Sequence, residues 1–379
     1  MKKILCSVAT LGLSAMLAAP AFAQGNESAL ELGLGGYFRG YVTYHNQDTA
    51  AGSEERHFDI IRDTEIHMDG KTKLDNGLTV GMHFEFRADM GDGFTVDKSY
   101  MYASGDWGKV NFGAADGVGF TMQVAAPSAD SNIDGMRHQV KGVNYTLVGG
   151  AIGPHLQAIE WDYSHDVSGS TDKISYFSPL FSGLQLGVSY TPDVQATSFV
   201  GNAEGSGASR GLNGVNSDDV AGSYGSAWEL AARYEREIQA VKLTLGTGYT
   251  HVDHEEDAAS EDDLTAWNVA GALKYGDFGV GVAYTENDNG RDPDDETDIL
   301  VVGVDYKMGD WKLGASWYNR EDENLTGATD LDTDRYSGGV VYKYGPGMDF
   351  RASLHYIDHD FGTENIDATS FVVGTQINF

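Results

Sequence analysis

The chain has 379 residues and carries 57 acidic against 25 basic side chains, which gives a formal net charge of −32. Such an excess of negative charge repels phosphate backbones and excludes nucleic acid as a partner. Beyond the first 23 residues, no stretch contains the roughly 18 consecutive apolar residues of a membrane-spanning helix, so a membrane location would require a closed β-barrel.

Residues 1–23 have the features of a secretory signal peptide. Two lysines precede a mostly apolar run, and the segment ends in Ala-Phe-Ala, a small-x-small cleavage pattern. A membrane anchor is the alternative, but the run is short and no stop-transfer pattern follows it. We therefore expect cleavage after Ala23. Cleavage would remove Cys6, the only cysteine, and would leave 23 basic and 57 acidic residues, a formal charge of −34.

From residue 24 onward the chain repeats one unit, a segment of about ten residues with alternating polarity between turn residues. In residues 78–90, for example, apolar side chains alternate with polar ones that include His83, Glu85 and Arg87. One face of such a strand suits lipid and the other suits water. An even number of strands is expected, sixteen, near residues 30–45, 57–70, 78–90, 96–104, 109–116, 171–179, 183–192, 227–236, 241–251, 264–275, 278–286, 297–307, 311–320, 334–344, 348–358 and 367–379.

A soluble β-sandwich also alternates and is the main alternative fold. Its inner faces must fill a dry core, and a chain of this size would usually form several domains. Here the polar face carries many charges, 49 glycines suit tight turns and crowded walls, and no Pro/Ser-rich linker divides the chain. The sequence therefore predicts an all-β fold, a sixteen-stranded antiparallel transmembrane barrel over residues 24–379.

The connections between these strands alternate in length. Short glycine-containing turns, several followed by an aromatic residue that would lie at the lipid interface, mark one end as periplasmic: 105–107, 276–278, 309–311 and 345–347. The long polar or acidic connections 193–226, 251–263, 286–296 and 321–334 suit the outer surface, with no more than loosely bound divalent cations. A calcium-loop spacing at 285–296 is weak, because Thr285 occupies the first ligand position and the flanks are predicted strands.

The connection between the fifth and sixth predicted strands is far longer than the others. Residues 117–170 are more than a structureless loop should contain unless it is functional. An apolar stretch, 148–159, could pack against the barrel wall. Its length and this apolar stretch suit a segment that folds into the barrel, and an exposed loop or an extra hairpin are the alternatives. The acidic residues expected to face the channel, counting the one just before the segment, are Asp116, Asp130, Asp134, Glu160 and Asp162.

The final strand alternates apolar side chains and ends on Phe379, which resembles the recognition signal of the outer-membrane barrel-assembly machinery. With residues 34–44, 73–78 and 105–113, it makes the chain similar to the general diffusion porins of Gram-negative outer membranes, the sixteen-stranded trimeric type. The resemblance implies a homotrimer surrounded by outer-membrane lipid and lipopolysaccharide. It also implies passive diffusion of small hydrophilic solutes and an infolded third loop that narrows the channel.

Family porins set acids on this loop against a basic cluster on the opposite wall. Arg39 matches the basic position of the first strand, whereas Glu65 and Asp97 stand where arginines are usual, which favours a cation preference. Strand register makes Glu65 and His83 plausible neighbours. The expected pore-lining set is Arg39, Glu65, His83, Arg87, Asp97, Asp116, Asp130, Asp134, Glu160 and Asp162.

Three other functions are alternatives to a general pore. Catalysis is disfavoured because His67 and its acidic neighbours lack a serine nucleophile or an open-metal histidine set, so no catalytic residue, structural metal or cofactor is expected. A substrate-specific channel would need aromatic side chains on the inward face, but the clear aromatic residues have outward parity. Tyr100 and Tyr102 are also expected to face outward, where with Gly36 and Gly40 they could form a contact between subunits. The third alternative function is that of a structural or adhesive barrel of the cell envelope.

Overall fold

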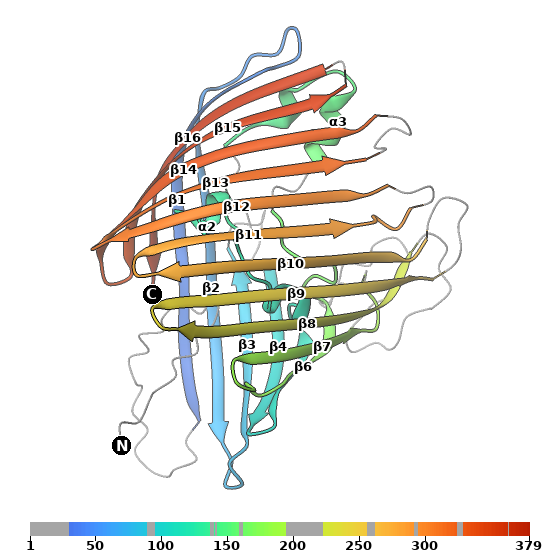
Figure 1. The fold of residues 1–379 in the computed structure, drawn as a ribbon, viewed down its shortest axis with the longest axis vertical. Helices are drawn as coiled ribbons and strands as arrows, with labels where there is room; N and C mark the ends of the chain where they lie inside the picture. The colour runs from blue at the N-terminus through green and yellow to red at the C-terminus, as the bar shows by residue number, and fades with distance from the viewer. Residues whose placement is uncertain are drawn as a thin grey trace.

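The computed structural model describes residues 30–88, 95–136, 140, 142–158, 162–194, 223–255, 262–291, 295–323, 329–362 and 364–379. These form one closed barrel of antiparallel strands, each paired with its neighbours in the chain (Figure 1). The sixteen predicted strands are confirmed. They are β1 (Glu31–Gln47), β2 (Phe58–Lys73), β3 (Thr79–Arg87), β4 (Thr95–Gly105), β5 (Gly108–Ala114), β6 (Asp172–Phe177), β7 (Leu184–Thr191), β8 (Tyr224–Ile238), β9 (Val241–His254), β10 (Leu264–Tyr275), β11 (Phe278–Asn287), β12 (Thr297–Met308), β13 (Trp311–Asp322), β14 (Leu331–Gly345), β15 (Met348–Phe361) and β16 (Glu364–Asn378).

The barrel closes between its first and last strands. In the ladder of β1 and β16, Tyr37 lies opposite Asn378. Beyond it the Gly36 and Phe379 backbones exchange two hydrogen bonds, of 3.0 and 3.1 Å. The C-terminal residue therefore completes the sheet and leaves no free strand edge at the seam.

Alternation of side chains explains the two surfaces of the wall. In β1, Tyr37 and Tyr41 point inward and are buried, whereas Phe38 and Val42 point outward and are exposed. Aromatic pairs border the apolar outer band at both ends. At the short-turn end, Trp107 stacks on Tyr176 and Trp311 on Tyr342, and at the other end Tyr190 packs on Trp228. Two aromatic girdles around an apolar band are the arrangement expected in lipid. Among the described residues, no helix is long and apolar enough to cross a membrane.

The strand connections follow the predicted pattern. Gly276, Gly309 and Gly347 adopt φ angles of 57°, 59° and 73°, the left-handed conformation that a tight hairpin turn requires. At the other end several strands from β8 onward extend further than expected, because the alternation continues into the acidic segments. For example, β14 begins at Leu331, and β9 includes His254, which was predicted to lie in a loop.

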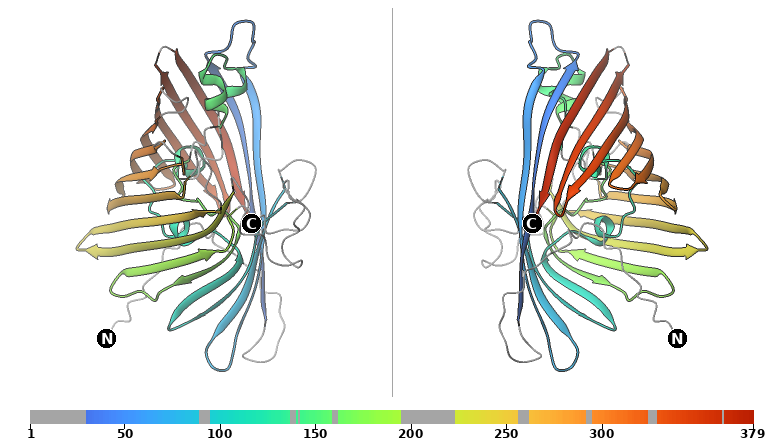
Figure 2. Two further views of the ribbon diagram at one scale, coloured as in Figure 1. Left: turned by 90° about the vertical axis from the view of Figure 1, so that its right-hand side faces the viewer. Right: turned by 90° about the vertical axis from the view of Figure 1, so that its left-hand side faces the viewer.

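The long connection after β5 enters the barrel, which confirms the infolded prediction over an exposed loop or an extra hairpin. It contains α1 (Val118–Thr121), α2 (Ser131–Asp134), the 3-10 turn η1 (Tyr145–Leu147) and α3 (Ile152–Ala158), which lie between the walls in the two views of Figure 2. We call residues 117–170 the infolded loop. As the sequence predicted, its apolar stretch packs on the wall, in a cluster of Tyr145, Val148, Ile152, Leu156, Leu331, Ile357, Phe361 and Ala368.

Inward-facing glycines on the strands from β7 to β14 make room for this loop. A Cβ atom on Gly303 would lie 1.9 Å from the carbonyl oxygen of Pro127, and one on Gly314 would lie 2.2 Å from the backbone nitrogen of Ala129. Both distances are far below van der Waals contact, so these positions admit only glycine while the loop lies against the wall. Glycines that meet the loop in the same way are Gly187, Gly246 and Gly281.

Candidate pore site

Charged side chains cover the inner face of β1, β2 and β3. Arg39 Nη1 lies 2.9 Å from Asp63 Oδ2, and Arg87 Nη2 lies 4.0 Å from the other oxygen of the same carboxylate. Glu65 stands opposite Arg87 in the ladder of β2 and β3. The side chains of Arg39 and Arg87 remain 12% and 22% exposed, so water reaches them inside the barrel. We call this face of β1–β4 the charged wall.

Two histidines lie within the charged wall. His83 Nδ1 is 2.7 Å from Asp69 Oδ1, and its Nε2 is 2.8 Å from Glu85 Oε1. Because ionised carboxylates only accept hydrogen bonds, His83 donates through both ring nitrogens and is an imidazolium. His67 Nε2 lies 3.2 Å from Glu65 Oε1. In the ladder of β2 and β3, Asp69 lies opposite His83 and Glu65 lies opposite Arg87, so the predicted pairing of Glu65 with His83 is wrong.

A β-bulge in β4 changes the fourth-strand position. Glu85 pairs with Lys98 and Phe86 with Val96, so Asp97 is the extra residue. Lys98 then points inward, where its Nζ lies 2.9 Å from Glu85 and 3.0 Å from Asp116. The charged wall therefore has a cation, Lys98, opposite Glu85, where the sequence predicted the acid Asp97. The register slip moved every later side chain of β4 to the other face.

Acids of the infolded loop hold it to the inner faces of β1, β13 and β15. Asp130 is fully buried; its Oδ1 lies 2.7 Å from Arg351 Nη1, and it accepts a hydrogen bond of 3.2 Å from the Tyr41 hydroxyl. Asp134 is buried as well and accepts a hydrogen bond from the Ser316 hydroxyl at 3.1 Å. Burial raises the pKa of Asp134 to about 6, against the opposing effect of Arg335. These two acids therefore anchor the loop, whereas the sequence suggested that they face the channel.

The first and last turns of the loop meet at β8 and β9. Glu229 accepts hydrogen bonds from the backbone N–H of Gly119, at 3.1 Å, and from the Ser168 hydroxyl, at 2.5 Å. The Nε2 atom of His165 is 2.7 Å from the Thr250 hydroxyl. Burial lowers the pKa of His165 to about 4, so this imidazole is neutral at pH 7. The loop is thus fixed to the barrel at both of its ends.

The remaining predicted residues are divided between the two regions. Asp116 lies two residues after the end of β5 and belongs to the charged wall through Lys98. Asp162 is half-buried in the returning part of the loop. Glu160 lies outside the described residues. The predicted set thus separates into a wall group and a loop group, and the loop acids Asp130 and Asp134 are removed from solvent.

Comparison with known protein families decides what this barrel is. The family model described as Gram-negative porin matches residues 9–362. The chain belongs to the Gram-negative porin family. The porin is therefore an outer-membrane channel through which solutes diffuse, and it is not an enzyme.

Solved porin structures share the fold of this porin at low sequence identity. The anion-selective porin from Comamonas acidovorans has a TM-score of 0.58 and 16% identity over 93% of this chain and 100% of that chain. A porin refined at 1.8 Å resolution has a TM-score of 0.59 and 16% identity over 92% of this chain and 100% of that chain. A triple mutant of the Rh. blastica porin has a TM-score of 0.55 and 20% identity over 92% of this chain and 100% of that chain. Comparison with curated protein sequences found no match.

Some tyrosines of the porin lie on the face opposite to the predicted one. Tyr100 faces His83 across the β3–β4 ladder with ring centroids 5.2 Å apart, and Tyr102 packs under Lys109 Nζ at 4.8 Å. Both point inward because of the β4 bulge. The prediction that they form an outer subunit contact is therefore wrong.

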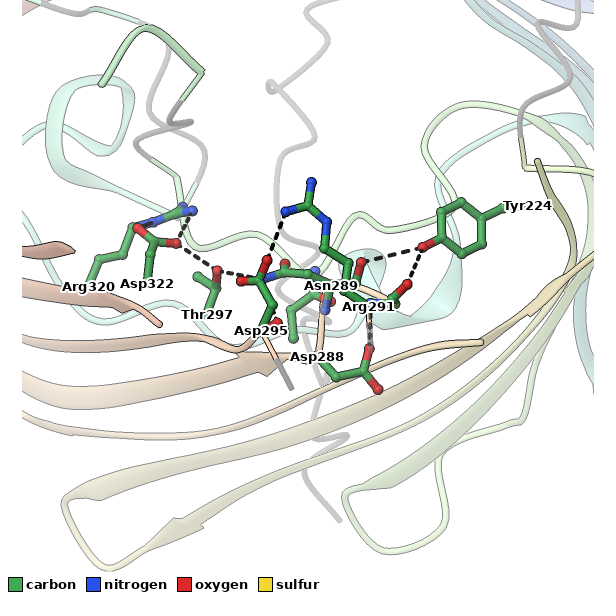
Figure 3. Close-up of polar contacts among 10 residues, drawn as sticks. Tyr224, Asp288, Asn289, Arg291, Asp295, Thr297, Arg320 and Asp322 are labelled. Carbon is green, nitrogen blue, oxygen red and sulfur yellow. Dashed lines mark hydrogen bonds and ion pairs between the residues drawn. The ribbon is translucent and has the colours of Figure 1, made fainter. Parts of the chain in front are cut away.

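At the long-loop end of the porin, residues of the β11–β12 connection contact one another and Tyr224 at the start of β8 (Figure 3). The Asn289 amide donates to the Asp295 backbone oxygen at 2.9 Å and to the Thr297 hydroxyl at 3.1 Å. The Tyr224 hydroxyl donates to the Asn289 backbone oxygen at 3.3 Å, and Arg291 pairs with Asp295 at 2.8 Å. The segment with a calcium-like spacing thus joins strands β11 and β12, and the Asn289 side chain is used in closing the loop.

Several residues of the site were missed in the sequence analysis. Glu85 had inward parity beside His83 and Arg87, so the alternation could have identified it. Arg351 is an isolated basic residue with inward parity in β15, which is a weak signal for a loop partner. The inward direction of Lys98 follows from the bulge, which no local residue pattern marks.

Proposed function

We propose that this porin is a general diffusion channel for small hydrophilic solutes and ions, selecting by size and charge without a cofactor or covalent step. The observation that carries the proposal is the pairing of two inner surfaces. The charged wall on β1–β4 keeps partial contact with water, and the infolded loop covers the strands opposite. A loop held in this way narrows the channel, and the charged wall sets the field that a solute meets there.

A cation preference is part of this proposal. Around His83, the described part of the charged wall has five acids against three permanent cations and the His83 imidazolium, and the whole chain is strongly acidic. The acids are Asp63, Glu65, Asp69, Glu85 and Asp116, and the cations are Arg39, Arg87 and Lys98. A low-dielectric wall focuses such a field. The preference should weaken in strong salt, because the screening length falls from about 10 Å at 0.1 M to about 3 Å at 1 M.

A substrate-specific channel is the nearest competing function. Inward tyrosines do exist. Tyr37 and Tyr41 are 6% and 2% exposed, and their hydroxyls donate to Glu65 and Asp130. Tyr100 and Tyr102 are half-buried against His83 and Lys109. They are structural contacts and do not form an open aromatic path for a sugar. We therefore favour the general channel over the specific one, and over an adhesive or structural barrel that does not conduct.

Planar-bilayer recording tests the conducting function. We expect the purified porin to give stepwise currents whose conductance rises with salt concentration and does not saturate with any one class of small sugar or amino acid. A water-filled channel has this property because no binding step limits the flow. A closed barrel would favour the adhesive function, and block that saturates with one solute class would favour the specific channel.

The assembly of the porin is also proposed from its family. We propose a homotrimer in outer-membrane lipid and lipopolysaccharide, assembled through the Phe379 strand after loss of residues 1–23, with divalent cations bound only loosely at the external acids. Native mass measurement after mild detergent extraction should give three chains. A stable monomer at all concentrations would contradict the trimer.

A further inference from the structure

Three metal-ligating side chains of the charged wall form a compact set. Glu65, His67 and Glu85 extend from β2 and β3, and one donor atom of each lies within 4.8 Å of the other two. Glu65 Oε1 and His67 Nε2 are 3.2 Å apart. In a tetrahedral zinc site with bonds of about 2.1 Å, donor atoms lie about 3.4 Å apart. Small side-chain rotations would therefore bring all three donors onto one ion.

Neighbouring groups orient the two carboxylates. The Tyr37 hydroxyl donates to Glu65 Oε2, which leaves Glu65 Oε1 directed at His67. Lys98 Nζ lies 2.9 Å from Glu85 Oε2. Hydrogen bonds of this kind fix the direction of metal ligands in known sites. The side chains of Glu65, His67 and Glu85 are 9%, 16% and 13% exposed, so water from the channel can supply the fourth ligand.

The local charge also favours a cation. Glu65 and Glu85 each place a carboxylate oxygen within 4.8 Å of the other and of a His67 ring nitrogen, and like charges at this distance repel unless a proton or a cation lies between them. Lys98 and the His83 imidazolium compensate Glu85 only in part, because Lys98 Nζ is also 3.0 Å from Asp116 and His83 Nδ1 is also 2.7 Å from Asp69. An imidazole with two carboxylates suits Zn²⁺ and its transition-metal neighbours, whereas Ca²⁺ prefers six to eight oxygens.

We propose that Glu65, His67 and Glu85 form a binding site for a divalent transition-metal ion, best matched by Zn²⁺, on the charged wall of the channel. A bound ion would add two positive charges beside the path of solutes and would oppose cation flow. The site goes beyond the proposed channel function, and binding can be measured without conduction. The two conclusions can therefore fail separately.

Calorimetric titration of the detergent-solubilised full-length porin with Zn²⁺ tests the site. We expect one ion per chain, and at least tenfold weaker binding in His67→Gln, which keeps the size of the side chain but loses the imidazole. Tyr37→Phe should weaken binding about tenfold, since it removes only the group that orients Glu65. Ca²⁺ should give no saturable heat at the same concentrations.

His251→Gln is the matched control, because His251 belongs to the other described histidine–acid group, with Asp253 and Asp263 at the outer rim. It should bind Zn²⁺ as the wild type does. Absence of saturable Zn²⁺ binding, unchanged affinity in His67→Gln, or loss confined to His251→Gln would each overturn the site. Conductance recorded without Zn²⁺ in the same preparation tests the channel function independently.

Discussion

Asp130→Ala is expected to release the middle of the infolded loop and to raise the single-channel conductance. The substitution breaks a buried ion pair with Arg351 and removes the acceptor of the Tyr41 hydroxyl. Breaking a buried pair from one side costs about 3–5 kcal/mol. Because Asp349 still pairs with Arg351, we expect a free-energy cost at the low end of this range, about 3 kcal/mol. That is roughly a hundredfold rise in the population of the detached loop.

Asp349→Asn is the matched control for this experiment. It also removes an acid from Arg351, but Asp349 lies in β15 and does not belong to the loop. Bilayer recording and limited proteolysis of the loop should therefore change in Asp130→Ala and remain near wild type in Asp349→Asn. Equal conductance and equal protease resistance in all three proteins would show that the Asp130 contact does not hold the loop. The double change Asp130→Leu with Arg351→Met should restore attachment, since an apolar pair leaves no unpaired charge.

Glu65→Gln combined with Glu85→Gln is expected to move the ion selectivity of the channel from cations toward anions. The double change keeps side-chain size but removes two negative charges, so that three acids face the cations Arg39, Arg87 and Lys98. The imidazolium of His83 then gives the wall a net positive charge. In a tenfold KCl gradient the wild-type reversal potential should have the cation sign, within the limit of about 59 mV for a monovalent ion. The double variant should shift it by tens of millivolts toward the opposite sign.

Asp75→Asn with Asp106→Asn is the matched control for charge. These acids lie exposed in short turns, so the same loss of two charges occurs away from the charged wall. Their effect should be screened at 0.1 M salt and above. A wild-type potential near zero or of anion sign would contradict the proposed cation preference. An unchanged potential in the Glu65 and Glu85 double variant would show that the charged wall does not set it.

The sequence by itself determined the barrel and its strand count, and it predicts an orientation in the membrane. These features follow from a period of two residues repeated along the chain, from glycine turns such as Gly276 and Gly309, and from the terminal Phe379. Each of them is local, because alternate side chains of a strand must face lipid and water in turn. The length of residues 117–170, together with the resemblance to the porins, predicted a loop that folds inward.

Only the tertiary structure decided what the site residues do. Whether Asp130 lines the channel or holds the loop depends on Arg351, which is 221 residues away in the chain. Whether Asp97 or Lys98 faces Glu85 depends on a one-residue bulge, which inverts the faces of a strand without changing its composition. Alternation assigns a side chain to a face, but the partners on that face come from strand register and from a distant loop. The charge that a solute meets is therefore fixed by the packing of the whole barrel.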